Sequence, residues 1–351
     1  MTAQEIYELA LSYYDGIDGK DKNVNKAFDL FYQAALDNNS NAQWYVGMMY
    51  YSGIGVNVDY TEAVKWLRLA AEQGNDDAQN DLANLLYYGK GVEQNYVEAA
   101  KWYKAAAEKG GDDAQFSLGV MYFHGFGVEK NYDESFKWFA LSAEQENPEA
   151  QSNLGKMYLY GIGVEKDYKE AAEWLEMAAE NGINEAQLMI GKMYYDGQGV
   201  IQDYAEAFKW YKLAAEQNDP FAQYLLGCLY SMGRGVGMDY IEAEKWYRLS
   251  ADQGYIQSQY EMGKIYYYGD GVKADLVEAE KWFKLASDNG HDEAKRILIT
   301  LSKEEFNKEL AATFEKAGMV IVNSSDGTVM SEAEVEKMLN QNSLNNLDLS
   351  N

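Results

Sequence analysis

Cysteine, histidine and long apolar runs are scarce in this chain of 351 residues. Its single cysteine, Cys228, excludes an internal disulfide and favours a reducing compartment. No window reaches the roughly 18 consecutive apolar residues that a membrane-spanning helix needs, so we expect no membrane insertion. The opening residues, MTAQEIYELALSYYDG, lack the basic and apolar segments of a signal peptide. These absences together predict a cytoplasmic protein.

Basic residues are also few, with 30 lysines and arginines against 57 aspartates and glutamates and a formal net charge of -27. Such a chain repels phosphate backbones and anionic lipid surfaces, so we expect it to bind no nucleic acid. The charge favours a basic protein partner. The alternative is that acidity only keeps a tyrosine-rich protein soluble.

The two histidines, His124 and His291, lie in no local motif for nucleophilic catalysis, which requires an imidazole beside a nucleophile and an acid. Cys228 has no metal-ligating residue near it in the sequence. The repeated Gly-x-Gly segments lack the preceding strand and the third glycine of a dinucleotide site. The sequence therefore predicts no catalytic residue, no cofactor and no metal site, and indicates that the protein is not an enzyme.

A repeat of 36 residues is the dominant feature that the sequence does contain. A fixed period of this length is typical of a solenoid, in which stacked units share one continuous core, so we expect one elongated domain. One glutamine and one tryptophan mark each full copy. The glutamines are Gln43, Gln79, Gln115, Gln151, Gln187, Gln223 and Gln259, and the tryptophans are Trp66, Trp102, Trp138, Trp174, Trp210, Trp246 and Trp282.

The first half of each copy has the pattern of a helix, which we term helix A. In the first full copy Ala42, Val46 and Met49 share one face at helical spacing and predict a helix over residues 41–51. Gly47 follows Val46 and recurs in most later copies. Because an interior glycine costs a helix about 1 kcal/mol relative to alanine, its recurrence indicates a neighbouring helix that passes too close for a side chain.

The second half begins with a glycine turn and forms helix B. Gly53 and Gly55 can adopt the positive φ that ends helix A and reverses the chain. Asp59 and Glu62 then have the spacing of a capping box, and every full copy keeps Asp or Asn at the first position and Glu at the second. This pattern fixes the expected start of helix B.

The repeat divides the chain into four parts. Residues 1–40 form a degenerate N-terminal capping repeat of two helices, 41–291 form seven full repeats, 292–317 form C-terminal capping helices, and 318–351 form an extension. In the extension we expect short strands over 319–322 and 328–330, a helix from Ser331 to about Leu339, and a disordered end.

The repeated unit resembles the Sel1-like repeat family over about residues 3–295. The copy from Ala150 to Gly182, AQSNLGKMYLYGIGVEKDYKEAAEWLEMAAENG, shows the resemblance well. The resemblance implies an all-α fold, a right-handed α/α superhelix related to tetratricopeptide arrays. It also implies an adaptor that holds other proteins or peptides, usually in bacteria or the endoplasmic reticulum.

Candidate binding residues are those on helix A that the repeat does not fix. Three rows of such positions begin at residues 44, 48 and 52 and recur in every copy. Exposed aromatic residues rimmed by acids suit a protein or peptide ligand, so we expect the A helices to line a concave binding surface. The alternative is that these rings only pack on adjacent A helices. The candidates are Trp44, Met48, Tyr51, Tyr88, Phe116, His124, Tyr160, Tyr224, Tyr260 and Tyr268.

Three functions are compatible with these patterns. The leading hypothesis is a non-catalytic scaffold or adaptor that binds a protein or peptide partner in the concave groove. An immunity-type or regulatory inhibitor that masks a toxin or enzyme is the second. A hydrolase of the β-lactam-binding kind is the third, although the sequence shows no Ser/Lys or Ser/His cluster for it. The sequence makes no prediction of oligomeric state.

Overall fold

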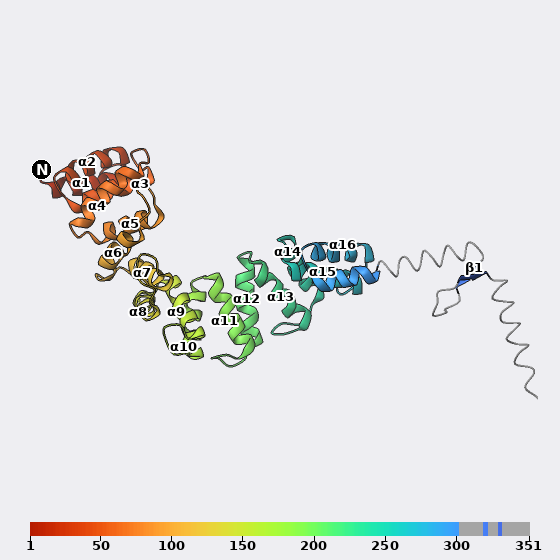
Figure 1. The fold of residues 1–351 in the computed structure, drawn as a ribbon. Helices are drawn as coiled ribbons and strands as arrows, with labels where there is room; N and C mark the ends of the chain where they lie inside the picture. The colour runs from red at the N-terminus through yellow and green to blue at the C-terminus, as the bar shows by residue number, and fades with distance from the viewer. Residues whose placement is uncertain (302–318, 322–328, 332–351) are drawn as a thin grey trace, which may run out of the picture. The chain divides into compact units, whose positions relative to one another are not determined.

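The computed structural model describes residues 1–301, 319–321 and 329–331. These residues form an all-α solenoid of consecutively packed helices, followed by one two-stranded sheet (Figure 1). The helices are α1 (Ala3–Asp15), α2 (Val24–Leu36), α3 (Ser40–Ser52), α4 (Tyr60–Glu72), α5 (Asp76–Tyr88), α6 (Tyr96–Ala107), α7 (Asp112–His124), α8 (Tyr132–Ala143), α9 (Pro148–Tyr160), α10 (Tyr168–Glu180), α11 (Asn184–Asp196), α12 (Tyr204–Glu216), α13 (Pro220–Met232), α14 (Tyr240–Asp252), α15 (Ile256–Tyr268) and α16 (Leu276–Asp288).

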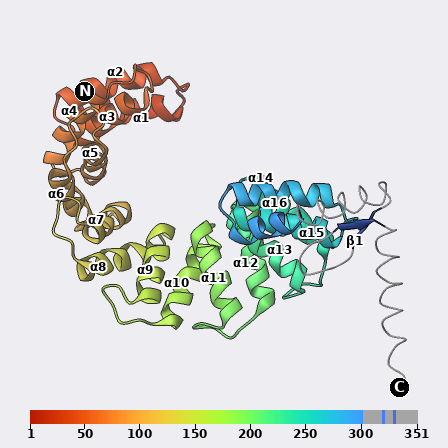
Figure 2. The same cartoon turned by 45° about the vertical axis from the view of Figure 1, so that its right-hand side comes forward.

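Odd-numbered helices are the A helices and even-numbered helices are the B helices. The chain divides into a first compact unit, residues 1–217 with α1–α12, and a second that begins at residue 218 with α13–α16. Within each unit, every A helix packs on its own B helix, and each A helix after the unit's first also packs on the preceding B helix. In the first unit, α5 and α7 lie on the inner side of an arc and α6 and α8 on its outer side (Figure 2).

The predicted start of helix B is confirmed. The Asp59 side chain accepts hydrogen bonds from the backbone N–H groups of Thr61 and Glu62 at 2.9 and 3.0 Å, and Asp or Asn caps every later B helix. The reciprocal half of the predicted capping box differs, because the Glu62 carboxylate pairs with Lys65. Among the helices described, both halves of a capping box are recorded at α1.

An ion pair joins two consecutive B helices. The Glu98 carboxylate of α6 pairs with Arg68 on the preceding B helix, α4. That guanidinium lowers the pKa of Glu98. Lys101 lies over the Trp102 ring, 5.1 Å from its centroid.

The interior glycine of helix A marks a close helix contact, as predicted. A Cβ on Gly119 of α7 would lie 2.7 Å from the Phe139 ring on α8, and a Cβ on Gly47 would lie 2.7 Å from Leu67 on α4. Atoms do not approach so closely, so any side chain here would push the two helices of the repeat apart.

The second glycine of each turn has a role that the sequence did not reveal. Gly127 has a φ of +69°, and a Cβ there would lie 2.1 Å from the carbonyl oxygen of Tyr96, the first residue of the preceding B helix. Equivalent approaches bring Gly163 to Tyr132 and Gly199 to Tyr168. The turn of one repeat therefore rests directly on the backbone of the repeat before it.

In most repeats the glutamine joins three helices. On α7, the Gln115 side-chain amide donates to the carbonyl of Ala107 at the end of α6 at 3.2 Å. Its oxygen accepts from Gln145, just after α8, at 2.8 Å. Gln43, Gln79, Gln151, Gln187 and Gln259 make the same bond to the preceding B helix.

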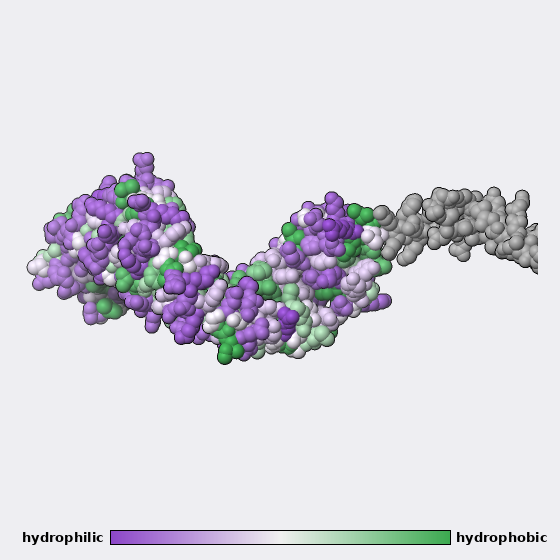
Figure 3. All heavy atoms as spheres, turned by 60° about the horizontal axis from the view of Figure 1, so that its bottom comes forward, coloured by the Kyte–Doolittle hydropathy of each residue, from purple (hydrophilic) through white to green (hydrophobic). Residues whose placement is uncertain are grey.

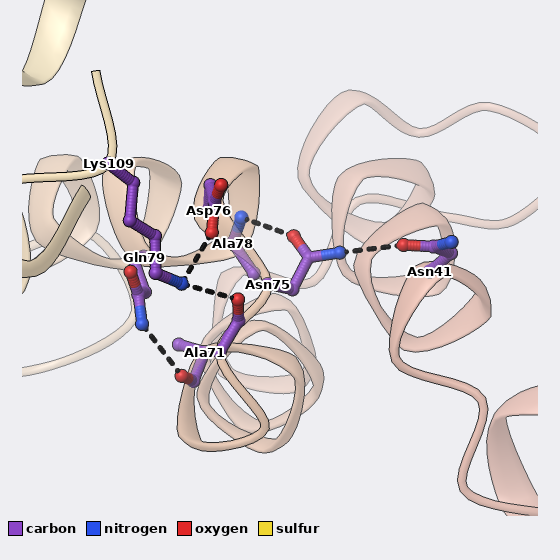
Figure 4. Close-up of polar contacts among 8 residues, drawn as sticks. Asn41, Ala71, Asn75, Asp76, Ala78, Gln79 and Lys109 are labelled. Atoms are coloured by element: carbon purple, nitrogen blue, oxygen red, sulfur yellow. Dashed lines mark hydrogen bonds and ion pairs between the residues drawn. The ribbon is translucent and has the colours of Figure 1, made fainter. Parts of the chain in front are cut away.

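Lys109 alters this arrangement at α5 (Figure 4). Lys109 occupies the position that Gln145 has in the next repeat. Its ammonium binds the Gly74 carbonyl at 2.7 Å and the Asp76 carboxylate at 2.5 Å. Gln79 still donates to Ala71, but its side-chain oxygen is buried and has no donor among the described residues. A buried amide oxygen without a donor is rare and destabilising.

The structure describes both ends of the chain in part. The degenerate first copy forms α1 and α2, and residues 292–301 are helical at the start of the predicted C-terminal cap. In the extension, β1 (Met319–Ile321) pairs antiparallel with β2 (Val329–Ser331). The predicted last helix after Ser331 and the tail lie outside the described residues. Within the described part of the chain, the helices are too short or too polar to cross a bilayer.

Replacing Gly127 with alanine should destabilise the array by two separable effects. A left-handed φ costs a residue with a Cβ about 1–2 kcal/mol, and the clash with Tyr96 should add about 1–3 kcal/mol. Gly182→Ala is the matched control, because Gly182 also has a positive φ, +87°, but no atom within 4 Å of a built Cβ. Urea unfolding of both variants measures the difference, and equal losses would contradict the inter-repeat contact.

Candidate functional site

The first row of predicted binding residues packs between helices. All four aromatic members of this row are half-buried, and each has a ring partner on its own or a neighbouring helix. These partners lie on the same A helix or on the B helix of the same repeat, whereas the alternative placed them on adjacent A helices. The ring pairs are Trp44 with Tyr45, Phe116 with Phe139, Tyr224 with Tyr247, and Tyr260 with Phe283.

The third row is exposed, as a binding surface requires. Tyr88, Tyr160 and Tyr268, at the C-terminal ends of their A helices, are 65%, 58% and 65% exposed. His124 is also exposed and stacks on Phe126, with ring centroids 5.2 Å apart. Most of the surface seen in Figure 3 is hydrophilic, with small separate hydrophobic areas.

Pockets recur at equivalent positions between consecutive A helices. One of about 250 Å³ lies between α3 and α5, over Leu67 of α4. A second, of about 210 Å³, lies three repeats further on, between α9 and α11, and uses equivalent positions such as Leu159 for Tyr51 and Met189 for Asp81. In the second unit, a third of about 250 Å³ lies between α15 and the helix over residues 292–301, with Phe283 in the place of Leu67.

The first of these, the Asp81 pocket, contains a carboxylate that the sequence did not single out. The pocket is lined by Met48 and Tyr51 of α3, Leu67 of α4, Asp81, Asn84, Leu85 and Tyr88 of α5, and Lys90 of the following turn. The Trp44 indole N–H donates to the Asp81 carboxylate at 2.7 Å. Asp81 has no cation within ion-pair distance in the described part of the chain.

Burial raises the pKa of Asp81 to about 6. The Trp44 hydrogen bond opposes this rise, and the negative charges of Asp77 on the same helix and Asp113 on α7 add to it. Lys90 lines the same pocket, but its ammonium is 3.3 Å from the hydroxyl of Tyr51. The carboxyl group is therefore close to half-protonated in mildly acidic solution and ionised at neutral pH.

The other two pockets have different polar groups. In the second, Lys192 lies on α11 and pairs with Asp196 at 2.5 Å. In the third, Lys264 on α15 pairs with Glu261 at 2.7 Å. The three pockets thus use equivalent positions of the repeat and differ in the charged residues that line them.

The residues that sequence analysis set aside as non-catalytic have structural partners. His291 accepts the backbone N–H of Ala294 at 3.2 Å and stacks on Tyr260, with centroids 4.2 Å apart. Burial raises the pKa of the Cys228 thiol, whose sulfur accepts the Tyr247 hydroxyl at 3.3 Å. In the described ranges, no cluster of three or more His, Cys, Asp or Glu side chains could hold a metal ion.

The chain consists of helix pairs of nearly constant length that repeat in register. Such an arrangement is an α/α repeat solenoid, and its pockets between A helices vary in their lining. The Sel1 repeat model matches residues 6–39, 40–75, 76–111, 112–147, 148–183, 184–219, 220–255 and 256–291, and the chain belongs to the Sel1 repeat family. The match over 6–39 includes the copy that the sequence analysis treated as a cap. Sel1 repeats typically build protein-interaction scaffolds, generally without catalysis.

Two solved structures support this assignment. The chain is 34% identical to a protective antigen of uropathogenic Escherichia coli strains with an SLR fold, with a TM-score of 0.82 over 86% of this chain. The matched region covers 65% of the length of that antigen. A Sel1 repeat protein from Oxalobacter formigenes is 32% identical, with a TM-score of 0.64 over 85% of this chain and 86% of its own. No curated protein matched the chain.

Replacing Asp81 with asparagine should stabilise the protein at neutral pH. The pKa of Asp81 is higher in the folded state than in the unfolded state. Ionisation of this carboxyl therefore begins to lower the free energy of unfolding as the pH rises above about 4, and the loss is complete above about pH 6. Asparagine keeps an oxygen for the Trp44 N–H. We expect a gain of about 1–2 kcal/mol near neutral pH, allowing for solvent screening, and none near pH 4.

Urea unfolding at both pH values measures this effect. Asp77→Asn is the control, because Asp77 is exposed on the same helix. A gain that is the same at both pH values, or that Asp77→Asn reproduces, would show that ionisation of Asp81 is not its cause.

Proposed function

We propose that this protein is a non-catalytic scaffold that binds a protein partner along the groove between its A helices. One observation carries the proposal: equivalent pockets recur between A helices while the residues that line them vary from repeat to repeat. Core packing does not require this variation. A surface of fixed geometry and variable chemistry suits the recognition of an extended polypeptide.

The exposed third row supplies the anchors of this surface. Tyr88 lines the Asp81 pocket and Tyr160 lines the pocket between α9 and α11, so an exposed ring borders each of these two pockets. Large aromatic side chains dominate binding energy at protein interfaces and lose little conformational entropy when they are fixed. We infer that these tyrosines contact the partner directly.

The charge of the chain indicates the character of that partner. A net charge of -27 favours association with a basic surface and raises the rate of encounter at low salt. An inhibitor that masks a basic toxin or enzyme is the narrower form of this proposal. One-to-one binding that abolishes the partner's activity would distinguish it from a scaffold that holds several proteins.

The proposal predicts that removing the exposed row abolishes partner binding. The test compares wild type with a Tyr88→Ala/His124→Ala/Tyr160→Ala variant by affinity purification from the native cell and mass spectrometry. We expect the variant to lose its specific partners, with affinity reduced at least about tenfold, because each buried aromatic contact contributes about 1 kcal/mol or more.

The matched control carries three changes on the B helices, where Leu141, Met177 and Leu213 are 43%, 36% and 38% exposed. Their triple alanine variant removes three exposed apolar side chains from outside the groove and should keep the partners. If the groove variant recovers the same proteins as wild type at unchanged affinity, the groove is not the binding surface.

A further inference from the structure

We propose that the Asp81 pocket binds a positively charged side chain, lysine or arginine, of the protein partner. This inference rests on the proposed function and assigns the ligand chemistry of one position in the groove. Its basis is an ionisable carboxylate inside a pocket, held in place and without a cation of its own in the described structure.

The position of the carboxylate is fixed from one side. The Trp44 indole N–H binds one carboxylate oxygen of Asp81 at 2.7 Å. The other oxygen has no hydrogen-bond donor among the described residues. A single neutral donor satisfies only part of an ionised carboxylate, which can accept several hydrogen bonds. The remaining capacity suits an ammonium or guanidinium group.

Comparison with the equivalent acid in the second unit shows what Asp81 lacks. Glu261 of α15 occupies the same position in its repeat, and Lys264, three residues later, neutralises it at 2.7 Å. Three residues after Asp81 the chain has Asn84, whose side-chain oxygen accepts the Tyr103 hydroxyl at 2.7 Å. The intramolecular cation present in one repeat is therefore replaced by a neutral group in the other.

The pocket walls fit the rest of a basic side chain. Met48 and the rings of Tyr51 and Tyr88 line the pocket around the carboxylate. Such walls pack against the methylene stem of lysine or arginine, and aromatic faces attract the cationic head. Lys90 already places its ammonium 5.4 Å from the centroid of the Tyr51 ring, so the rim of this pocket accommodates a cation.

Asp81 also costs the free protein stability, since burial disfavours its ionised form. Groups that destabilise the fold while facing a pocket are typical of functional sites. A cation bound in the pocket would neutralise the ionised Asp81 carboxylate and so remove this destabilisation. The stabilisation would be available only in the complex.

The test uses n-butylguanidinium, n-butylammonium and n-pentanol as probes of the full chain. The readout is the indole N–H resonance of Trp44 in ¹⁵N-labelled protein, assigned from its loss in Trp44→Phe. We expect saturable shifts with both cations in the millimolar range, and binding of n-pentanol at least about tenfold weaker, because the alcohol has the stem without the charge.

Three variants then test the role of charge. Asp81→Asn should weaken cation binding at least about tenfold, and Asp77→Asn should weaken it far less, because Asp77 acts on Asp81 only through its charge. Lys90→Met should strengthen it about two- to fivefold by removing a like charge from the rim. Asp81→Asn is expected to fold at least as stably as wild type, so lost binding would not reflect unfolding. Pentanol binding equal to that of the cations, or cation binding unaffected by Asp81→Asn, would overturn the inference.

The native partner separates this inference from the proposed function. If the exposed-row variant loses its partners while Asp81→Asn keeps them at wild-type affinity, the groove binds protein but the charge assignment fails. If the cations bind as expected while the exposed-row variant keeps all partners, the pocket chemistry holds and the groove function fails.

Discussion

The close approach between glycine backbone and neighbouring helices is the constraint on which this structure depends. Within a repeat, Gly119 leaves no room for a side chain beside Phe139, and between repeats, Gly127 rests on the carbonyl of Tyr96. Both contacts recur at a fixed period, so each repeat sets the position of the next. The buried glutamines reinforce this geometry because they bind the carbonyl at the end of the preceding B helix.

This rigidity allows the remaining positions to vary. The three pockets have similar volumes, about 250, 210 and 250 Å³, while the residue at the position of Asp81 becomes Met189 in the second pocket and Ile297 in the third. The shape of these pockets is thus determined by residues that the repeats share, and their chemistry by residues that differ from one repeat to the next. A scaffold of this kind can change its ligand without changing its fold.

The sequence predicted what each repeat does by itself and missed what depends on neighbours. The helix bounds, the Asp59 cap and the glycine next to Val46 follow from local patterns, and all were confirmed. The Trp44 bond to Asp81 joins residues in adjacent repeats, so no local pattern indicates it. The first-row rings, predicted as exposed candidates, are half-buried, and their ring partners lie within the same repeat.

The unpartnered oxygen of Gln79 bears on how the array unfolds. Gln151 shares this defect, because the side-chain amide of Asn181 donates to the carbonyl of Met177 on α10 at 3.0 Å. Stability in a solenoid is approximately a sum of terms for each repeat and for each interface. One such bond between the A and B helices contributes about 1 kcal/mol. The Lys109 ammonium offsets its loss at Gln79 by binding Gly74 and Asp76, whereas the Asn181 bond lies within α10. Local opening of the first unit is therefore easier at the repeat of Gln151 than at the repeat of Gln79.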